Sequence, residues 1–201
     1  EFTVQFTNAK TIGITGSNGK TTTTMLTYHL LKEAGLNVGL AGNIGKSFAW
    51  QVAEENFDVY VLELSSFQLD GIINYKPNIA IITNISPDHL DRYDYNYDNY
   101  IASKFRITMN QDENDYLIYD NDAISNWLQN NKTKAQLIPF SLLEKMKNGA
   151  FINNDTMEVS INNEEFAMKT TDISLEGKHN MKNAMAATSV AQLMKIRKQT
   201  I

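Results

Sequence analysis

The feature that most constrains this chain is a glycine-broken loop between a short apolar strand and a helix. It lies in the stretch Ile12-Gly-Ile-Thr-Gly-Ser-Asn-Gly-Lys-Thr-Thr-Thr-Thr24. Gly16 and Gly19 allow a tight turn whose N–H groups face inward, and the following helix directs its positive end toward the same space. Lys20 can reach the β- and γ-phosphates of a nucleotide, and the Thr21 hydroxyl can bind Mg²⁺. The stretch therefore predicts a phosphate-binding loop.

This loop is shorter than the usual eight-residue phosphate loop. The usual pattern has a glycine five residues before its last glycine, where this chain has Ile14. An ordinary glycine-rich turn is the alternative interpretation, but the strand before the loop and the helix after it favour phosphate binding. We expect nucleotide contacts from the consecutive positions Gly16, Ser17, Asn18, Gly19, Lys20, Thr21 and Thr22.

The composition is that of a globular protein with an apolar core. Of 201 residues, 42% are hydrophobic and 20% are charged, and the net charge of −5 argues against binding nucleic acid through the overall field. The chain has no cysteine, which excludes disulfides, thiolate metal sites and a cysteine nucleophile. Apolar runs such as Ile79–Ile82 are too short to cross a bilayer, and no signal peptide is visible. We therefore expect a cytoplasmic protein without nucleic-acid or membrane partners.

The order of apolar segments predicts the fold. Short apolar runs alternate with helical patterns up to residue 140, which is typical of an α/β protein with a parallel sheet. We expect strands at 11–15, 37–41, 58–64, 79–83, 115–119 and 136–140, and helices from about 22, at 97–108 and at 123–129. The alternating segments 150–152, 157–161 and 165–168 predict antiparallel hairpins. The predicted fold class is α/β, with a P-loop-type, mostly parallel sheet flanked by helices and a small antiparallel β-meander near the C-terminal end.

Apolar spacing predicts a buried face on the first and the last helix. In the first helix these residues are Leu26, Leu30 and Ala34, and Gly35 ends the helix. The last helix begins near Gly177, and its expected buried residues are Ala187, Val190, Ala191 and Met194. Asn180 and Asn183 are expected to share the exposed face of its first turn.

Polar side chains gather where two of the predicted strands end. Glu63 lies at the end of the run 58–64, and the loop after strand 79–83 carries Asp88, His89, Asp91 and Arg92. A carboxylate in a buried strand is unfavourable unless it is paired or bound to a metal. Ligands of open α/β sheets bind beyond the carboxyl ends of the strands, where the phosphate loop also lies. We therefore expect Glu63 and His89 to contribute to a nucleotide or metal site.

Six motifs follow one another along the chain: Gly16-Ser-Asn-Gly-Lys-Thr-Thr-Thr23, Gly42-Asn-Ile-Gly45, Glu63-Leu-Ser-Ser-Phe-Gln-Leu69, Asn84-x-x-x-Asp-His-Leu-Asp-Arg-Tyr93, Tyr100-x-x-x-Lys104 and Gly177-x-His-Asn-x-x-Asn-Ala-x-Ala186. The Mur ligases have these motifs in the same order, and residues 10–195 resemble that family. The third motif resembles the branch of the family that adds D-glutamate to UDP-N-acetylmuramoyl-L-alanine.

The resemblance implies catalytic and metal-binding roles for matching positions. Lys20 would hold the β- and γ-phosphates of ATP, and Thr21 with Glu63 would bind a first Mg²⁺. His89 would bind a second Mg²⁺ together with Lys104, which members of the family carbamylate. The resemblance thus makes Lys20, His89 and Lys104 the expected catalytic residues.

The resemblance also implies contacts with the two organic substrates of the first step. Those to the muramoyl-alanine substrate would come from Asn43, Ser65 and Gln68, and those to adenine from His179, Asn180 and Asn183. Asp91 and Arg92 match the family pattern and are assigned to the architecture of the site.

The implied reaction forms an amide bond at the expense of ATP. A carboxylate attacks the γ-phosphate to give an acyl phosphate and ADP, and an amine then displaces phosphate. Because the carboxylate is already a nucleophile, the protein must mainly neutralise charge, which Lys20 and two Mg²⁺ ions would do. The expected partners in the full enzyme are ATP, UDP-N-acetylmuramoyl-L-alanine and D-glutamate, in peptidoglycan precursor synthesis.

The resemblance also implies a domain organisation. Mur ligases have an N-terminal, a central and a C-terminal domain, whereas here the phosphate loop begins within 16 residues of the start. We expect residues 1–10, which alternate weakly, to form a linker, a boundary segment or an edge strand. Residues 11–201 would be the central ATP-binding domain without its two flanking domains, which are its expected protein partners. Alone, this part is expected to form no amide bond and to bind nucleotide weakly.

Three alternative interpretations remain at this point. Another Mur-type or folylpolyglutamate-type ligase shares the general motifs. A P-loop regulatory ATPase module belongs to another class, and its guanine-specific forms need Asn-Lys-x-Asp, which Asn131-Lys-Thr-Lys134 does not satisfy. A small-molecule kinase usually has an arginine-rich lid, and this chain has few arginines, namely Arg92, Arg106 and Arg197.

Overall fold

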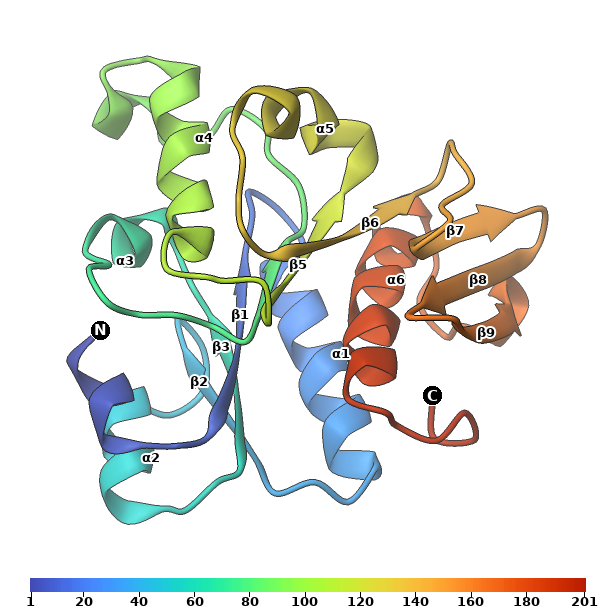
Figure 1. Cartoon of the computed structure of the whole chain (residues 1–201), viewed down its shortest axis with the longest axis horizontal. Coiled ribbons are helices and arrows are strands. Elements are labelled where there is room, and N and C mark those ends of the chain that lie inside the picture. Colours follow the sequence, from blue (N-terminus) through green and yellow to red (C-terminus); the bar gives the residue numbers. More distant parts are fainter.

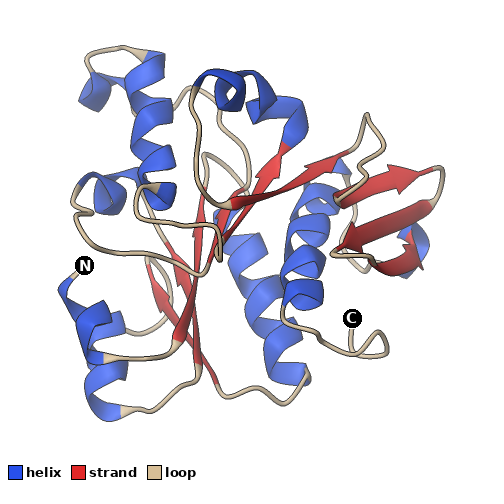
Figure 2. Ribbon diagram, viewed as in Figure 1, coloured by secondary structure: helices blue, strands red, loops and turns tan.

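The computed structural model describes residues 1–201 and contains one nine-stranded sheet with helices on both faces (Figures 1 and 2). The strands are β1 (Lys10–Thr15), β2 (Val38–Gly42), β3 (Val59–Glu63), β4 (Ile79–Ile82), β5 (Tyr116–Asp120), β6 (Gln136–Ser141), β7 (Gly149–Asn153), β8 (Thr156–Ile161) and β9 (Glu164–Lys169). Their order across the sheet is β2-β3-β1-β4-β5-β6-β7-β8-β9.

The sheet is parallel from β2 to β7 and antiparallel from β7 to β9. Every residue of β3 and β4 is buried, as expected for parallel strands covered on both faces. Each predicted strand is present with its ends within one residue of the expected bounds. The antiparallel hairpins extend the main sheet, so the predicted fold class is confirmed.

The helices form two layers that bury separate apolar clusters (Figure 2). They are α1 (Lys20–Glu33), α2 (Phe48–Glu54), α3 (Ser66–Asp70), α4 (Tyr97–Phe105), α5 (Asn121–Asn130) and α6 (Lys178–Leu193). Helices α1 and α6 pack side by side on one face through residues such as Leu31 and Val190. Helices α2 to α5 cover the other face, to which Leu69 and Phe105 contribute.

The first helix differs from the prediction in its start and in its buried face. It begins at Lys20, two residues earlier than expected, because the phosphate loop ends directly in the first helical turn. Its buried residues are Thr23, Thr24, Thr27 and Leu31, whereas the predicted face of Leu26, Leu30 and Ala34 is only half-buried. Helix α1 packs against the sheet on one side and against α6 on another, and its small threonine side chains allow both to approach closely. Gly35 has φ +82°, which confirms the predicted helix end.

The last helix is buried on more sides than its apolar pattern predicts. Residues from Asn183 to Gln192 are all buried, because α6 packs against α1, β6, β7 and β8. The predicted position of Asn183 on an exposed face is therefore wrong. Its side chain is only 6% exposed, and Asn183 Oδ1 accepts a hydrogen bond from Thr23 Oγ1 at 3.1 Å.

The first residues do not form an edge strand. Phe2–Phe6 form a 3₁₀ helix, η1, which lies against α2. The helix expected over 97–108 is present as α4 followed by a 3₁₀ turn at Arg106–Thr108. None of the helices in the structure has the length and apolar character needed to cross a membrane.

Candidate functional site

The predicted phosphate loop, Glu63 and the loop after β4 lie at one edge of the sheet. Their strands are neighbours in the order β3-β1-β4, and all three run in the same direction. The segments that follow these strands therefore emerge side by side at the carboxyl ends of the strands, where α/β proteins bind ligands. This confirms the expected juxtaposition of Glu63 with the phosphate loop.

Hydrogen bonds from the loop after β4 hold the phosphate loop in place. Ser17 N donates to the Asn84 carbonyl oxygen at 3.0 Å, and Asn18 N donates to Asn84 Oδ1 at 3.0 Å. Thr83 Oγ1 donates to the Asn18 carbonyl oxygen at 2.6 Å. Gly16 has φ +147°, and a Cβ at this position would lie 2.0 Å from Thr83 Oγ1. Gly16 is therefore required for the close approach of the two loops.

Two lysines meet at the Gly16 carbonyl oxygen. Lys20 Nζ donates to the carbonyl oxygens of Gly16 and Ser17 at 3.0 and 2.9 Å, and Lys104 Nζ donates to that of Gly16 at 2.9 Å. Burial, together with the positive charge of Lys20, lowers the pKa of Lys104 to about 8. The first bond of α1 runs from Thr23 N to the Gly19 carbonyl oxygen, so the N–H groups before it have no helical acceptor. The loop thus presents cationic and N–H groups to an anion.

Glu63 is a buried carboxylate without a cationic partner. Its side chain is 1% exposed and accepts hydrogen bonds from Thr21 Oγ1 at 2.8 Å and Asn43 Nδ2 at 3.0 Å. No lysine, arginine or histidine forms an ion pair with it. A buried carboxylate is costly without a compensating charge, so Glu63 together with the Thr21 hydroxyl fits a bound cation.

The Ser17 side chain faces the protein. Ser17 Oγ donates to the Ser86 carbonyl oxygen at 2.8 Å, accepts from Ser86 N at 3.0 Å and lies 2.8 Å from Tyr100 Oη. Because the N–H groups of Ser17 and Asn18 are also used within the protein, these two residues brace the phosphate loop. Tyr100 and Lys104 are one turn apart on α4, and both contact the loop.

His89 and its neighbours form the open side of this region. His89 has φ +47°, its side chain is 58% exposed, and its Nε2 lies 3.6 Å from Asp88 Oδ2. The centroid of its ring is 5.4 Å from that of Phe67. The structure has no group of three or more His, Asp and Glu side chains close enough to hold a metal ion. His89 therefore does not belong to a complete metal-binding group of this kind in the structure.

The three predicted substrate residues have other partners in this structure. Asn43 contacts Glu63 through both its side chain and its backbone N–H, which donates to the Glu63 carbonyl oxygen at 2.8 Å. Ser65 and Gln68 form the capping box of α3, with Ser65 N donating to Gln68 Oε1 at 2.9 Å and Gln68 N to Ser65 Oγ at 3.3 Å. Ser65 and Gln68 nevertheless lie just beyond Glu63 at the open edge of the site.

A cavity of about 1050 Å³ extends from the phosphate loop across the carboxyl ends of β5 and β6. The predicted nucleotide residues that line it are Asn18, Gly19, Thr22, His179, Asn180 and Asn183. Asn180 Nδ2 donates to the Glu176 carbonyl oxygen at 2.8 Å. A Cβ on Gly19 would lie 2.5 Å from Asn183 Oδ1, so the start of α6 approaches the phosphate loop closely at this point. The cavity is large enough for a nucleoside triphosphate, and it joins the phosphate loop to the start of α6.

The cavity also contains a charged cluster that the sequence analysis did not identify. Lys182 Nζ lies 2.8 Å from Asp120 Oδ2 and 2.9 Å from Asp122 Oδ2, and all three residues line the cavity. Burial raises the pKa of Asp120 above its usual value, although Lys182 opposes the shift. Asp120 is the last residue of β5, and ligands of α/β proteins bind beyond the carboxyl ends of the strands. Its position in the sequence was therefore sufficient to predict that it lies near the site.

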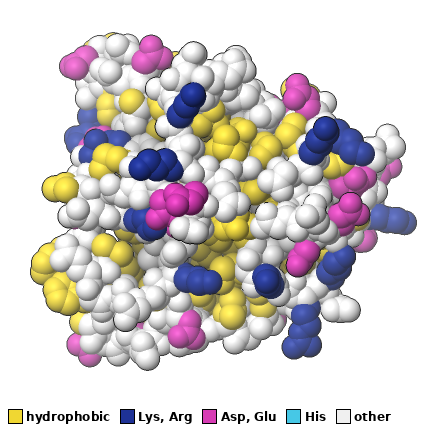
Figure 3. Space-filling model, in the orientation of Figure 1, with side chains coloured by type: hydrophobic (Ala, Val, Ile, Leu, Met, Phe, Trp, Pro, Cys, Tyr) yellow, Lys and Arg dark blue, Asp and Glu magenta, His cyan; other side chains and the backbone are white.

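Charged side chains on the face shown in Figure 3 do not form one basic patch. Lys and Arg side chains are interspersed there with Asp and Glu side chains. Any anion bound on this face must therefore be held by a local site.

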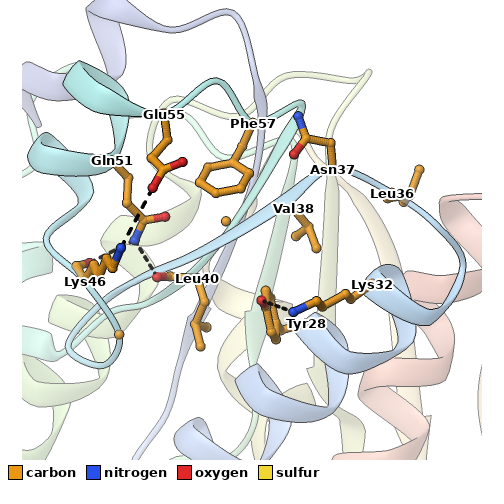
Figure 4. Close-up of a pocket in the computed structure, with 12 residues that line it drawn as sticks. Tyr28, Lys32, Leu36, Asn37, Val38, Leu40, Lys46, Gln51, Glu55 and Phe57 are labelled. Carbon is orange, nitrogen blue, oxygen red and sulfur yellow. Dashed lines mark hydrogen bonds and ion pairs between the residues drawn. The ribbon is translucent and has the colours of Figure 1, made fainter.

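A second cavity of about 470 Å³ lies along the free edge of β2, between α1 and α2 (Figure 4). Gln51 Nε2 donates to the Leu40 carbonyl oxygen at 2.7 Å there, and Lys46 Nζ lies 3.8 Å from Glu55 Oε1. None of the predicted site residues lines this cavity. Gln51 and Lys46 instead cover part of the strand edge, which protects it from pairing with other chains.

A family profile and curated relatives point to the same protein family. The profile of the Mur ligase middle domain matches residues 14–191. A protein from Christiangramia forsetii named UDP-N-acetylmuramoylalanine--D-glutamate ligase is 61% identical over 100% of this chain and 46% of its own length. A protein of the same name from Bacteroides thetaiotaomicron is 51% identical with the same coverage. The chain therefore spans less than half the length of these relatives.

Solved structures share the fold at low sequence identity. The structure of a UDP-N-acetylmuramoyl-L-alanyl-D-glutamate--2,6-diaminopimelate ligase has a TM-score of 0.74 and 22% identity, over 96% of this chain and 45% of that chain. MurF from Acinetobacter baumannii has a TM-score of 0.73 and 19% identity, over 98% of this chain and 45% of that chain. These likenesses concern the fold.

Proposed function

Because the chain belongs to the Mur ligase family, as a middle domain, we propose that it is the ATP-binding domain of a D-glutamate-adding ligase. The complete enzyme would join D-glutamate to UDP-N-acetylmuramoyl-L-alanine in peptidoglycan precursor synthesis. The name of the relatives with 61% and 51% identity supports this acceptor and this amino acid. The family match also makes the regulatory ATPase module and the small-molecule kinase the less favoured interpretations.

The observation that carries the proposal is the contact between Glu63 and the phosphate-loop threonine. Thr21 Oγ1 lies 2.8 Å from Glu63 Oε2, and no cation of the protein neutralises this buried carboxylate. Thr21 and Glu63 would hold the first Mg²⁺ beside the β- and γ-phosphates of ATP. Asn43 supports this role because its amide fixes the other carboxylate oxygen of Glu63.

Lys20 and the start of α1 would bind the phosphates. Lys20 Nζ needs only to leave the carbonyl oxygens of Gly16 and Ser17 to contact the β- and γ-phosphates. The unpartnered N–H groups at the start of α1 add positive potential at the same place. Mg²⁺ would supply charge neutralisation at the γ-phosphate while the substrate carboxylate attacks it to form the acyl phosphate and ADP. The amine of D-glutamate then displaces phosphate.

We further propose that Lys104 is carbamylated and shares a second Mg²⁺ with His89. A neutral lysine amine adds CO₂ to form a carbamate and releases a proton. A pKa of about 8 leaves part of the Lys104 side chain neutral near physiological pH, which favours this reaction. The carbamate would replace the ammonium at Gly16 by an anionic group. The His89 side chain is 58% exposed at the open side of the site, so a metal ion could reach its ring from solvent.

The remaining predicted residues would contact the organic parts of the substrates. His179 and Asn180 line the cavity at the start of α6 and would lie against adenine. Asn183 Oδ1 accepts from Thr23, so Asn183 would contact adenine through Nδ2, which donates to Asn180 Oδ1 at 3.3 Å in this structure. Ser65 and Gln68 would meet the muramoyl-alanine end. The part of the relatives that this chain does not span would supply the D-glutamate contacts, and nucleotide-linked substrates favour a cytoplasmic location.

The test is ADP release by the complete gene product. We expect release that depends on UDP-N-acetylmuramoyl-L-alanine and D-glutamate together, and a decrease of at least about 100-fold in the Lys20→Ala and Glu63→Ala variants. Diaminopimelate, lysine and L-glutamate serve as alternative amino acids. Equal activity with one of these, or with a folate acceptor, would contradict the proposed specificity. Calorimetry with a non-hydrolysable ATP analogue tests nucleotide binding separately.

A further inference from the structure

Asp70, the last residue of α3, joins three segments of the chain. Ser103 Oγ of α4 donates to Asp70 Oδ1 at 2.7 Å. Tyr93 Oη donates to Asp70 Oδ2 at 3.2 Å, and Arg92 Nε lies 3.5 Å from the same oxygen. Tyr93 and Arg92 belong to a 3₁₀ turn, η2 (Leu90–Tyr93). Ser103 and Tyr93 are buried, whereas the Asp70 side chain is 31% exposed, so this carboxylate ties α3, η2 and α4 together at the boundary between the interior and the surface.

Each of these segments carries a residue of the proposed site. Helix α3 begins with the capping box of Ser65 and Gln68, η2 follows directly after His89, and Lys104 is the neighbour of Ser103. Asp70 lies 23 residues before Tyr93 and 33 residues before Ser103, so the position of α3 relative to η2 and α4 depends on tertiary contacts. Asp70 supplies contacts to both of the other segments at once.

A second path leads from Asp70 to His89 through aromatic and cationic groups. Arg92 Cζ lies 4.5 Å from the centroid of the Phe67 ring, and this centroid is 5.4 Å from that of His89. Asp70 therefore orients the guanidinium that packs on the ring beside His89. His89 has a left-handed backbone conformation, which neighbours must hold because it is unfavourable for a residue other than glycine.

The position of Asp70 argues against a role in stabilising α3 itself. A negative charge at the C-terminal end of a helix opposes the helix dipole. Arg106 already caps this end, since its Nε donates to the Leu69 carbonyl oxygen at 2.9 Å and its Nη2 to that of Ile72 at 2.6 Å. The contacts that Asp70 makes with η2 and α4 therefore explain its presence better than any contribution to α3.

The geometry points to Asp70 as a positioning residue that sets His89 and Lys104 relative to the acceptor end of the site. This inference rests on the proposed function and adds a residue to it. No side chain of the phosphate loop contacts Asp70. Loss of its charge should therefore impair the step that involves the acceptor carboxylate and leave nucleotide binding almost unchanged.

The kinetic test uses the complete gene product with Asp70→Asn. We expect kcat to fall about tenfold, because three contacts lose a charged acceptor, and the KM for ATP to stay within about twofold. Asp70→Glu keeps the carboxylate and should recover most of the lost kcat. Asp94→Asn is the matched control, because Asp94 is exposed directly after η2 and its side chain forms no hydrogen bond or ion pair, and it should behave as wild type. Equal kcat in Asp70→Asn and Asp94→Asn would overturn the inference.

Amide hydrogen exchange on the same proteins tests the geometry without requiring activity. In Asp70→Asn, exchange should rise by about tenfold in residues 89–96 and around Ser103, and not in residues 12–24. A uniform rise in all elements, with a parallel loss of melting temperature, would mean a general structural role and would overturn the inference. If the wild-type enzyme formed no D-glutamate amide, the proposed function would fail, while the exchange pattern would still decide the role of Asp70.

A double-mutant cycle separates Asp70 from its partners. Tyr93→Phe and Ser103→Ala each remove one hydrogen bond to Asp70, and each also removes the hydrogen bond of 3.0 Å between Tyr93 Oη and Ser103 Oγ. If the contacts act through Asp70, either change should reduce kcat less in the Asp70→Asn background than in wild type. Strictly multiplicative effects would contradict the inference.

Discussion

Replacing Gly16 by alanine tests whether the close approach of two loops shapes the phosphate loop. The new Cβ would lie 2.0 Å from Thr83 Oγ1 and 3.1 Å from the Asn84 carbonyl oxygen, and residue 16 has φ +147°. A residue other than glycine at such a φ costs about 1–2 kcal/mol. Displacing the Thr83 hydroxyl from the Asn18 carbonyl oxygen costs about 1 kcal/mol more.

The expected loss of unfolding free energy for Gly16→Ala is therefore about 2 kcal/mol. This sum includes a gain of roughly 0.5 kcal/mol from the reduced freedom of the unfolded chain. For a chain of this size the melting temperature should fall by about 4–8 °C. Thermal unfolding and urea titration of the 201-residue chain measure the change, and calorimetry should show that binding of an ATP analogue is also lost.

Two other glycines provide matched controls. Gly35 has φ +82° and open space around it. Gly35→Ala should therefore lower the unfolding free energy by about 1 kcal/mol, from the unfavourable backbone conformation alone. Gly71 has no positive φ, and its nearest atom would be 3.7 Å from a new Cβ, so Gly71→Ala should be nearly neutral. Adding Thr83→Ala to Gly16→Ala removes the closest contact and should cost less than the sum of the two single changes. The reasoning is refuted if Gly16→Ala melts like Gly71→Ala.

Three further predictions concern residues of the candidate site. Glu63→Gln should abolish the Mg²⁺ dependence of ATP-analogue binding in calorimetry, because glutamine has nearly the size of glutamate but lacks the charge that would hold the cation. Unchanged Mg²⁺ dependence in this variant would exclude Glu63 as a metal ligand. Lys104 has a folded pKa of about 8 against an unfolded value of 10.5, so the unfolded chain binds the additional proton between these values. In CO₂-free buffer, the unfolding free energy of the wild-type chain minus that of Lys104→Met should therefore increase between pH 8 and pH 10.5. If this difference did not change with pH, the reasoning would be contradicted. Asn183→Ala should lower unfolding free energy by about 1 kcal/mol in urea titration, because Thr23 loses its buried acceptor; a larger loss in analogue affinity than in stability would favour the adenine role.

Local sequence patterns were sufficient to predict the fold. The strands at 58–64 and 79–83 are nearly continuous apolar runs rich in β-branched residues, and such runs form buried parallel strands because most of their side chains on both faces do not require water. Glycine at 16, 19 and 35 marked turns that the structure confirms by positive φ values. These signals depend on the backbone and on near neighbours in the chain, so no knowledge of the tertiary packing was needed.

Helix faces could not be predicted with the same success. Helix α1 buries threonines, and Leu26 and Leu30 on its expected face are only half-buried. The reason is that α6, which follows more than a hundred residues later, packs on α1 and selects which side chains are covered. The same contact buries Asn183, for which the local pattern predicted exposure.

The sequence by itself determined the residue types of the site and the strand ends from which they emerge. It assigned Lys20, Thr21 and Glu63 to one edge of the sheet because parallel strands share a direction. Only the tertiary structure decided which groups touch: Asn43 on Glu63, Lys104 on the Gly16 carbonyl oxygen, and Asp70 between α3, η2 and α4. Contacts of this kind join residues far apart in the chain, and their distances depend on the packing of whole elements, which no local spacing encodes.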